Sequence, residues 1–80
     1  MKCTQYFLYT KLRPDRIKIK EEWILRAINE PIKTEIQSDG RIRKWIKVPE
    51  EEKYLRVILL PDGETVHNVF FDRKYKGTKK

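Results

Sequence analysis

The 80-residue chain has a single cysteine, a single histidine, three glycines and no long apolar segment. The lone Cys3 excludes an internal disulfide and any zinc site built from several cysteines. The lone His67 has no cluster of other metal-binding residues to join. We therefore expect neither a metal ion nor another cofactor.

Several functional signatures are missing as well. No apolar run approaches the roughly 20 residues of a membrane helix, and residues 1–5 do not resemble a secretory signal. The sequence contains no glycine-rich phosphate loop and no nucleophile elbow. These absences predict a cytoplasmic protein that does not associate with membranes, and they argue against hydrolysis by serine, cysteine or metal chemistry.

Charge, in contrast, is abundant and unevenly placed. The formal net charge is +7, and charged residues make up 39% of the chain. Residues 1–20 hold six basic residues and one acidic residue, and residues 72–80 hold five basic residues and one acidic residue. Such concentration favours a polyanionic partner, because each neutralised phosphate releases condensed counterions. The alternative is that the basic ends are only solvated tails.

Propensity and turn residues predict the order of the elements. Residues 6–10 have strong strand propensity, and Pro14 lies in the turn that follows them. Apolar residues with helical spacing predict a helix over residues 19–29, which lacks a good N-cap and ends before Pro31. Alternation predicts four further strands, at residues 32–37, 41–48, 54–60 and 65–71.

This order predicts an α+β fold. We expect one antiparallel sheet of about five strands, in the order β-α-β-β-β-β, with one short helix packed on one face and the other face open. A single domain should span residues 6–75, and residues 76–80 should form a disordered basic tail.

The first hairpin, residues 32–48, has a register that its own alternation selects. A three-residue loop, Ser38-Asp39-Gly40 with Gly40 left-handed, groups the isoleucines of both strands on one face, with Lys44 as the exception. The opposite face then carries Lys33, Glu35, Gln37, Arg41, Arg43, Trp45 and Lys47.

The second hairpin, residues 54–71, turns at Pro61-Asp62-Gly63, which also favours a three-residue loop. In that register Leu60 faces Glu64, and Val57 faces His67. Side chains alternate along each strand, so two faces follow. The predicted core face carries Leu55, Val57, Leu59, Thr65, His67, Val69 and Phe71. The predicted open face carries Tyr54, Arg56, Ile58, Val66, Asn68 and Phe70.

If both hairpins belong to one sheet, basic, aromatic and amide side chains share its open face, with Arg56 and Asn68 in solvent. Arginines bind phosphate through paired donors, aromatic rings stack on bases, and asparagine can bond to a base edge. This combination predicts a surface for unpaired RNA. The alternative is that these side chains only shield their cross-strand neighbours. The predicted nucleic-acid-binding residues are Arg41, Arg43, Trp45, Tyr54, Arg56 and Asn68.

The order of these landmarks resembles a family of small prokaryotic domains of unknown function that is distantly related to the RelE/BrnT-type toxins. The resemblance covers roughly residues 6–75, and its motifs are mostly turns and strands. They are Asp15-Arg16-Ile17, Ile28-Asn29-Glu30-Pro31, Asp39-Gly40-Arg41, Tyr54-Leu55-Arg56-Val57, Asp62-Gly63 and Asn68-Val69-Phe70-Phe71-Asp72-Arg73.

The resemblance implies metal-independent endoribonuclease cleavage of mRNA by a toxin that has an antitoxin partner. It also implies that Arg43, Arg56, Arg73 and Tyr75 match the basic and aromatic residues of such toxins. Cleavage needs a base to activate a ribose hydroxyl and cations to stabilise the phosphate. Tyr75 or His67 is the candidate proton carrier, although alternation makes His67 a packed or edge residue.

Two other functions stay open on the sequence alone. One is a non-catalytic module that binds nucleic acid or a protein partner. The other is a self-associating protein, such as a homodimer, in which exposed Trp45 and Phe70 form the contact.

Overall fold

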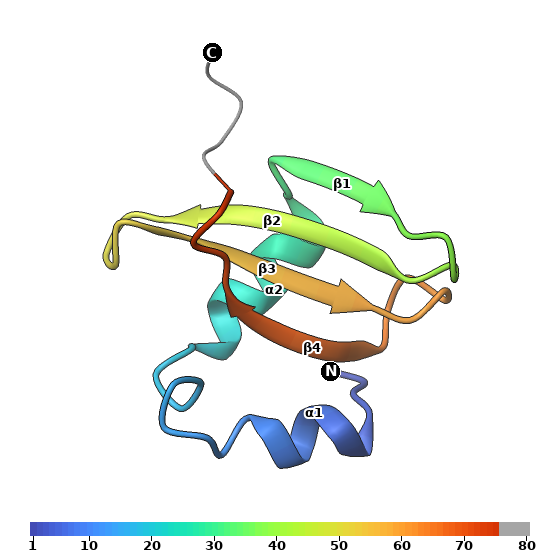
Figure 1. Ribbon diagram of the computed structural model, residues 1–80, viewed down its shortest axis with the longest axis horizontal. Coiled ribbons are helices and arrows are strands. Elements are labelled where there is room, and N and C mark those ends of the chain that lie inside the picture. Colours follow the sequence, from blue (N-terminus) through green and yellow to red (C-terminus); the bar gives the residue numbers. More distant parts are fainter. Residues whose placement is uncertain (76–80) are drawn as a thin grey trace.

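The computed structural model describes residues 1–75, so the predicted disordered tail, residues 76–80, lies outside the described residues. The elements follow the order α-α-β-β-β-β, with one antiparallel sheet in the order β1-β2-β3-β4. Figure 1 shows this sheet with α2 behind it and α1 below β4. The helices are α1 (Gln5–Thr10) and α2 (Glu21–Asn29), and the strands are β1 (Lys33–Ile36), β2 (Ile42–Val48), β3 (Lys53–Leu59) and β4 (Val66–Phe71).

The prediction of an α+β fold with an open antiparallel sheet is confirmed, but the sheet has four strands rather than about five, and a second helix replaces the first predicted strand. Neither helix within residues 1–75 has the length and apolar character that crossing a membrane would require.

Helix α1 occupies residues whose side chains favour a strand. The Thr4 side chain caps it by accepting a hydrogen bond from the Phe7 amide at 3.1 Å. Phe7 and Thr10, one helical turn apart, are its buried residues. Strand pairing is limited to the residues just before it, where the Val66 amide donates to the Lys2 carbonyl and the Thr4 amide donates to the Val66 carbonyl. The local cap and this tertiary contact outweigh strand propensity, which is a weak preference.

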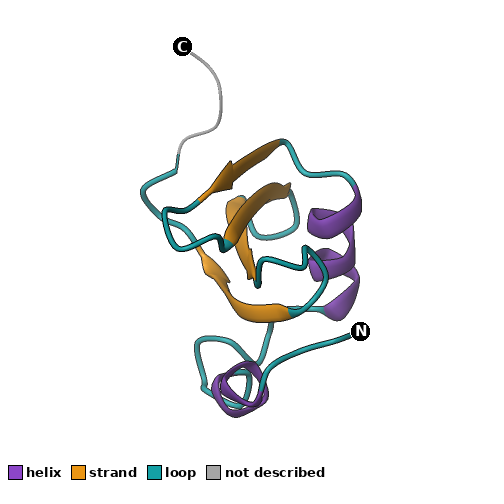
Figure 2. Ribbon diagram, turned by 90° about the vertical axis from the view of Figure 1, so that its right-hand side faces the viewer, coloured by secondary structure: helices purple, strands orange, loops and turns teal. Residues whose placement is uncertain are grey.

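Helix α2 matches its prediction closely. Lys20 stands at the N-cap without a side-chain hydrogen bond to the helix, as its residue type predicts. Trp23, Ile24 and Ala27 are buried, and they pack on β2 and β3. Figure 2 shows α2 lying along one side of the sheet. Lys44, the exception in the apolar face, donates from Nζ to the Ile28 carbonyl at 2.9 Å. Its ammonium thereby satisfies a free carbonyl at the helix C-terminus, where a positive charge is favourable.

The predicted register of the first hairpin is confirmed. Ile36 pairs with Ile42, the Gln37 amide donates to the Arg41 carbonyl, and Gly40 has a φ of +91°. One outcome differs in degree: Ile32 and Ile36 lie on the helix side, yet they are 47% and 74% exposed, because α2 covers β2 and β3 and leaves β1 uncovered.

The predicted register of the second hairpin is wrong by one residue at the turn and by two residues from Ile58 to Leu55. Leu55 pairs with Phe71 instead of Val69, and Leu60 pairs with Thr65 around a loop of residues 61–64. The Asp62 carboxylate enlarges this loop, because it accepts hydrogen bonds from the Glu64 and Thr65 amides and from the Thr65 hydroxyl.

A bulge in β4 then changes the alternation. Leu59 pairs with Val66 and Ile58 pairs with Asn68, so His67 is the additional residue. Val66, predicted on the open face, is fully buried in the core. His67 does not face Val57, and Val57 pairs with Val69 instead. The positions from Leu55 to Leu59 and from Asn68 to Phe71 keep their predicted faces, since a shift of two residues preserves parity.

Candidate nucleic-acid interface

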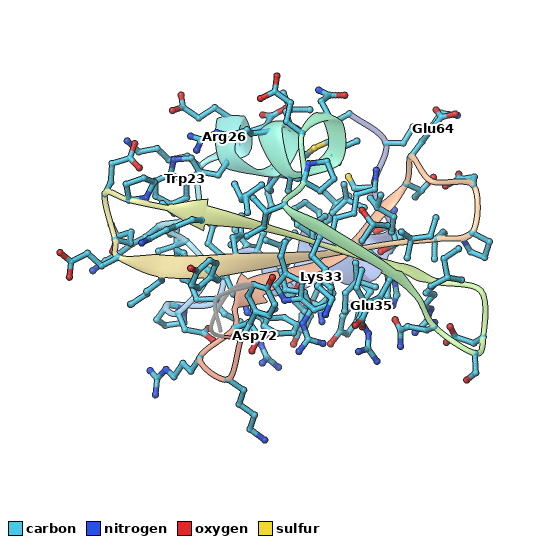
Figure 3. All side chains as sticks on the ribbon, turned by 90° about the horizontal axis from the view of Figure 1, so that it is seen from above. Trp23, Arg26, Lys33, Glu35, Glu64 and Asp72 are labelled. Carbon is cyan, nitrogen blue, oxygen red and sulfur yellow. The ribbon has the colours of Figure 1, made fainter. Side chains whose placement is uncertain are left out.

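The side chains on the sheet face opposite α2 form rows across the strands. Lys33, Trp45, Arg56 and Phe70 are neighbours in successive strands and make one row. Glu35, Arg43, Ile58 and Asn68 make the next row. The structure thus brings Arg43, Trp45, Tyr54, Arg56 and Asn68 to one surface, which we call the open face. Figure 3 shows Lys33, Glu35 and Asp72 on this side of the sheet and Arg26 on the other side, with α2.

Asp72, which was not among the predicted site residues, lies beside Tyr54 at one end of this face and links several of its side chains. Its Oδ2 accepts hydrogen bonds from Trp45 Nε1 at 3.0 Å and from Arg56 Nε and Nη2 at 3.1 and 2.8 Å. Its Oδ1 accepts from the amides of Lys74 and Tyr75 at 3.0 and 3.2 Å. One carboxylate therefore joins β2, β3 and the segment that follows β4.

These contacts set the ionisation of Asp72. Burial alone raises the pKa of its carboxyl, but the hydrogen bonds from Trp45, Arg56 and the Lys74 amide, together with the charge of Arg56, hold that pKa below its ordinary value of 3.8. The Asp72 side chain is 7% exposed and that of Arg56 is 23% exposed. The ion pair is therefore present at neutral pH, and Arg56 is only partly in solvent, contrary to the prediction.

The segment after β4 covers part of the open face. The Tyr75 ring stacks on Trp45 at a centroid distance of 5.2 Å and meets Tyr54 edge-on at 5.0 Å. Trp45 is consequently 4% exposed. Its indole has no free face for a nucleic-acid base or for a second protein copy, so the predicted exposure of Trp45 is wrong. Side chains from the end of the chain could not be placed from the sequence, because no periodic pattern extends beyond Phe71.

Arg16 reaches the open face from the segment between the helices. Its Nη1 donates to Asn68 Oδ1 at 3.0 Å, and its guanidinium lies 5.6 Å from the centroid of the Phe70 ring. The Arg56 guanidinium lies 4.8 Å from the same ring. Phe70 is thus flanked by two cations, and Asn68 is already hydrogen-bonded. Both side chains are therefore engaged within the chain.

A polar groove continues the open face beyond Phe70. It has a volume of about 460 Å³, and it runs between the segment after α1, the loop before β3 and the end of β4. Four basic residues line it, together with two acidic residues and the rings of Phe70 and Phe71. The basic residues are Arg16, Lys18, Lys53 and Arg73. We call this site the basic groove.

Of these four residues, only Arg73 is among the predicted site residues. Arg16, Lys18 and Lys53 lie outside the alternating positions of the predicted face, and only the folded chain brings them together. Arg16 and Lys18 belong to the highly basic segment of residues 1–20, and Lys53 had no such signal.

The opposite end of the open face carries Arg41 and Arg43. Arg43 Nη1 lies 3.5 Å from Glu35 Oε1, and Arg41 Nε lies 3.7 Å from Asp39 Oδ2. Both arginine side chains are between a third and a half exposed, at 34% and 43%. Their ion pairs are therefore weak.

His67 lies at the outer edge of β4, beside α1. Its ring stacks on Tyr6 at 5.0 Å, and its Nδ1 lies 3.2 Å from Thr4 Oγ1. Burial and the charge of Arg41 lower the pKa of the imidazole below its ordinary value of 6.5. The candidate catalytic residues therefore divide: Arg56, Arg73 and Tyr75 adjoin Asp72, whereas His67 packs against the first helix.

Residues 1–75 contain no group of three or more His, Cys, Asp or Glu side chains arranged to hold a metal ion. No protein-family model, curated protein or solved structure matches the chain. The resemblance to the RelE/BrnT-type toxins stays a prediction.

Proposed function

We propose that this chain binds RNA, preferably single-stranded, along its open face and basic groove, chiefly through the phosphate backbone. The observation that carries the proposal is the basic groove, where four basic residues outnumber two acidic ones and share the lining with Phe70 and Phe71. A cationic groove that also contains aromatic side chains suits a phosphate chain whose bases lie against rings or guanidinium planes.

The distribution of charge supports the same partner. The row residues Lys33, Arg43 and Arg56 all lie on the open face, and Lys47 extends it beside Tyr54, 5.9 Å from its ring centroid. The first turn of α2, on the other side of the sheet, carries Glu21 and Glu22. A polyanion would therefore approach the molecule with one face toward it.

The burial of Trp45 shapes the expected specificity. Because Tyr75 covers the indole and Arg16 occupies Asn68, two side chains predicted to read bases are engaged within the chain. Contacts to phosphates position a strand but do not distinguish sequences. We expect affinities that depend strongly on salt and weakly on base sequence.

Binding of fluorescent single-stranded RNA, followed by anisotropy at several salt concentrations, tests the proposal. Arg73 is exposed and lines the basic groove, so Arg73→Glu should weaken binding about tenfold and reduce the salt slope by about 0.7 for each lost phosphate contact. Arg26→Glu makes the same change of charge on α2, on the other side of the sheet, and should change affinity by less than about twofold. Equal losses in both variants would show that net charge, and not this surface, attracts the RNA.

A toxin-like endoribonuclease is a second candidate, and one observation favours it. Arg56 and Tyr75 are both joined to Asp72, with Arg73 between Asp72 and Tyr75 in the chain. Expression of the chain should then arrest growth and shorten transcripts, and Arg73→Ala should abolish both effects without loss of fold. Harmless expression with intact transcripts, combined with RNA binding in vitro, would leave the binding module as the function.

A further inference from the structure

Strand β1 is an edge strand whose outer side is uncovered in the described part of the chain (Figure 1). All four of its residues are exposed. The Gln37 amide donates to the Arg41 carbonyl of the neighbouring strand segment, so the peptide groups of Gln37 and Glu35 face β2. Because hydrogen-bonding direction alternates along a strand, the peptide groups of Thr34 and Ile36 point outward. Such an edge is a template for another strand.

The side chains along this edge are complementary to themselves. Residues 32–36 read Ile-Lys-Thr-Glu-Ile. If a second copy pairs antiparallel about a two-fold axis at Thr34, each Lys33 stands opposite Glu35 of the other copy, and each Ile32 stands opposite Ile36. Opposite charges in directly facing positions stabilise a strand pair, and the isoleucines bury each other.

We propose that β1 is a self-association edge, through which two copies of this chain form one continuous antiparallel sheet with Thr34 at the two-fold axis. The outward peptide groups then pair: the two Thr34 residues bond to each other, and each Ile36 amide meets the Ile32 carbonyl of the other copy. The Ile32 amide is already bonded to the Trp45 carbonyl at 2.8 Å. Each end of the joined pair therefore holds one hydrogen bond, from the Ile36 amide, and the Ile36 carbonyl has no strand donor there.

Nearby registers are unfavourable. Moving the axis to Glu35 sets two carboxylates against each other, and moving it to Lys33 sets two ammonium groups against each other, which destabilises directly opposed pairs. Within one copy, Lys33 Nζ lies 3.1 Å from Glu35 Oε2, with side chains 41% and 44% exposed. Such an exposed pair contributes little, so both groups can exchange partners.

The pairing also explains the exposed apolar residues of β1. Ile32 and Ile36 lie on the α2 side of the sheet but beyond the reach of α2, at 47% and 74% exposure. In the two-fold arrangement they become central residues of the joined sheet. Residues of equal parity share a face, so both α2 helices lie on one side and both open faces on the other.

Sedimentation of the full chain without nucleic acid, up to about 1 mM, tests this inference independently of RNA binding. The wild type should form dimers. Thr34→Pro removes an outward amide that does not bond to β2, and it should give monomers, whereas the matched Thr34→Val should still dimerise. A wild type that stays monomeric, or a folded Thr34→Pro variant that remains dimeric, would overturn the proposal.

A charge exchange keeps the proposal testable if proline unfolds the strand. Lys33→Glu and Glu35→Lys should each weaken the dimer roughly tenfold, since each places like charges at two symmetric positions. The combined Lys33→Glu/Glu35→Lys chain should restore it, because the pairs are opposite again. If Leu12→Ser, at a residue 69% exposed beyond α1, abolished association instead, the apolar surface near α1 would be the interface and the β1 proposal would fail.

Discussion

Replacing Arg56 with alanine should destabilise the fold, although the residue lies on the face predicted to be in solvent. Arg56 donates two hydrogen bonds to Asp72, and its guanidinium lies 5.5 Å from the Trp45 ring centroid and 4.8 Å from that of Phe70. Its removal leaves the Asp72 carboxylate, 7% exposed, with fewer donors for its charge. A buried charge that has lost hydrogen-bond donors destabilises the fold, because water does not replace those donors.

The size of the loss follows from the exposure of the pair. Breaking a fully buried ion pair costs about 3–5 kcal/mol, whereas exposed pairs contribute at most about 1 kcal/mol. Arg56 is 23% exposed, and Asp72 keeps donors from Trp45, Lys74 and Tyr75. We therefore expect Arg56→Ala to lower the free energy of unfolding by about 2 kcal/mol. For a chain of this size, that loss lowers the Tm by roughly 8–16 °C.

Asp72→Ala should cost more, about 3 kcal/mol, because it also leaves the buried Trp45 indole N–H without its acceptor and releases Tyr75. Urea unfolding followed by circular dichroism gives both values. The double variant should lose less than the sum of the two single losses, because each single change already breaks the same pair. Arg73→Ala, at an exposed neighbour of Asp72, is the control and should leave the Tm within about 2 °C.

The acid limb of the stability curve gives a second measurement of the same contact. The pKa of Asp72 is depressed in the folded chain, so its ionised form stabilises the fold above the ordinary value of 3.8, and that contribution is lost as the pH falls through this value toward the lower folded pKa. Asp72→Asn should therefore have a flatter stability profile below about pH 4 than the wild type. A Tm for Arg56→Ala equal to that of the wild type, with an unchanged acid limb for Asp72→Asn, would refute the reasoning.

Three further predictions test separate parts of the fold. Val66→Ala should lower the free energy of unfolding by about 2 kcal/mol in urea titrations, since the bulge makes Val66 a core residue; a negligible change would restore the register predicted from sequence. Lys44→Met should cost about 0.5–1 kcal/mol, measured in the same way, because it deletes the bond from Nζ to the Ile28 carbonyl at the C-terminus of α2. The pKa of His67 is lowered in the folded chain, so its neutral form stabilises the fold above pH 6.5, and this contribution is lost as the pH falls through 6.5. In urea titrations, the free energy of unfolding of the wild type should therefore decrease between about pH 7 and pH 5, and His67→Gln should remove this decrease.

Alternation in the first hairpin was sufficient to predict its structure. Only one loop length placed its isoleucines on a single face, and Gly40 supplied the left-handed residue that this loop needs. Helix α2 was equally clear, since Trp23, Ile24 and Ala27 repeat with helical spacing and are buried together. In both segments, local geometry and burial favour the same structure. Such agreement allows a structure to be predicted from the sequence.

The prediction failed where a polar contact decided the structure. The Asp62 carboxylate enlarges the second loop, and the Thr4 side chain caps a helix in a segment of strand-forming residues. Neither contact leaves a periodic signal, and each involves a residue type that is common in loops of any conformation. Parity on most of the second hairpin survived only because the register error was an even number of residues.

The candidate site was likewise predicted only in part, and the contacts that were missed determine which of its cations are free to bind a ligand. Parity correctly brought Trp45 and Arg56 to one face, but it could not show that Asp72 would engage both side chains, because that contact depends on the course of the chain after its last strand. The contacts of Trp45 and Arg56 with Asp72 stabilise the structure of the open face. Lys18 and Arg73 are exposed cations of the basic groove whose side chains form no hydrogen bond or ion pair within residues 1–75, so they are able to bind a phosphate without breaking an internal bond there. Changes at Arg73 should therefore weaken RNA binding and leave the Tm unchanged, whereas changes at Arg56 should lower both the Tm and the RNA affinity, because Arg56 is a partner of Asp72 as well as a cation of the open face.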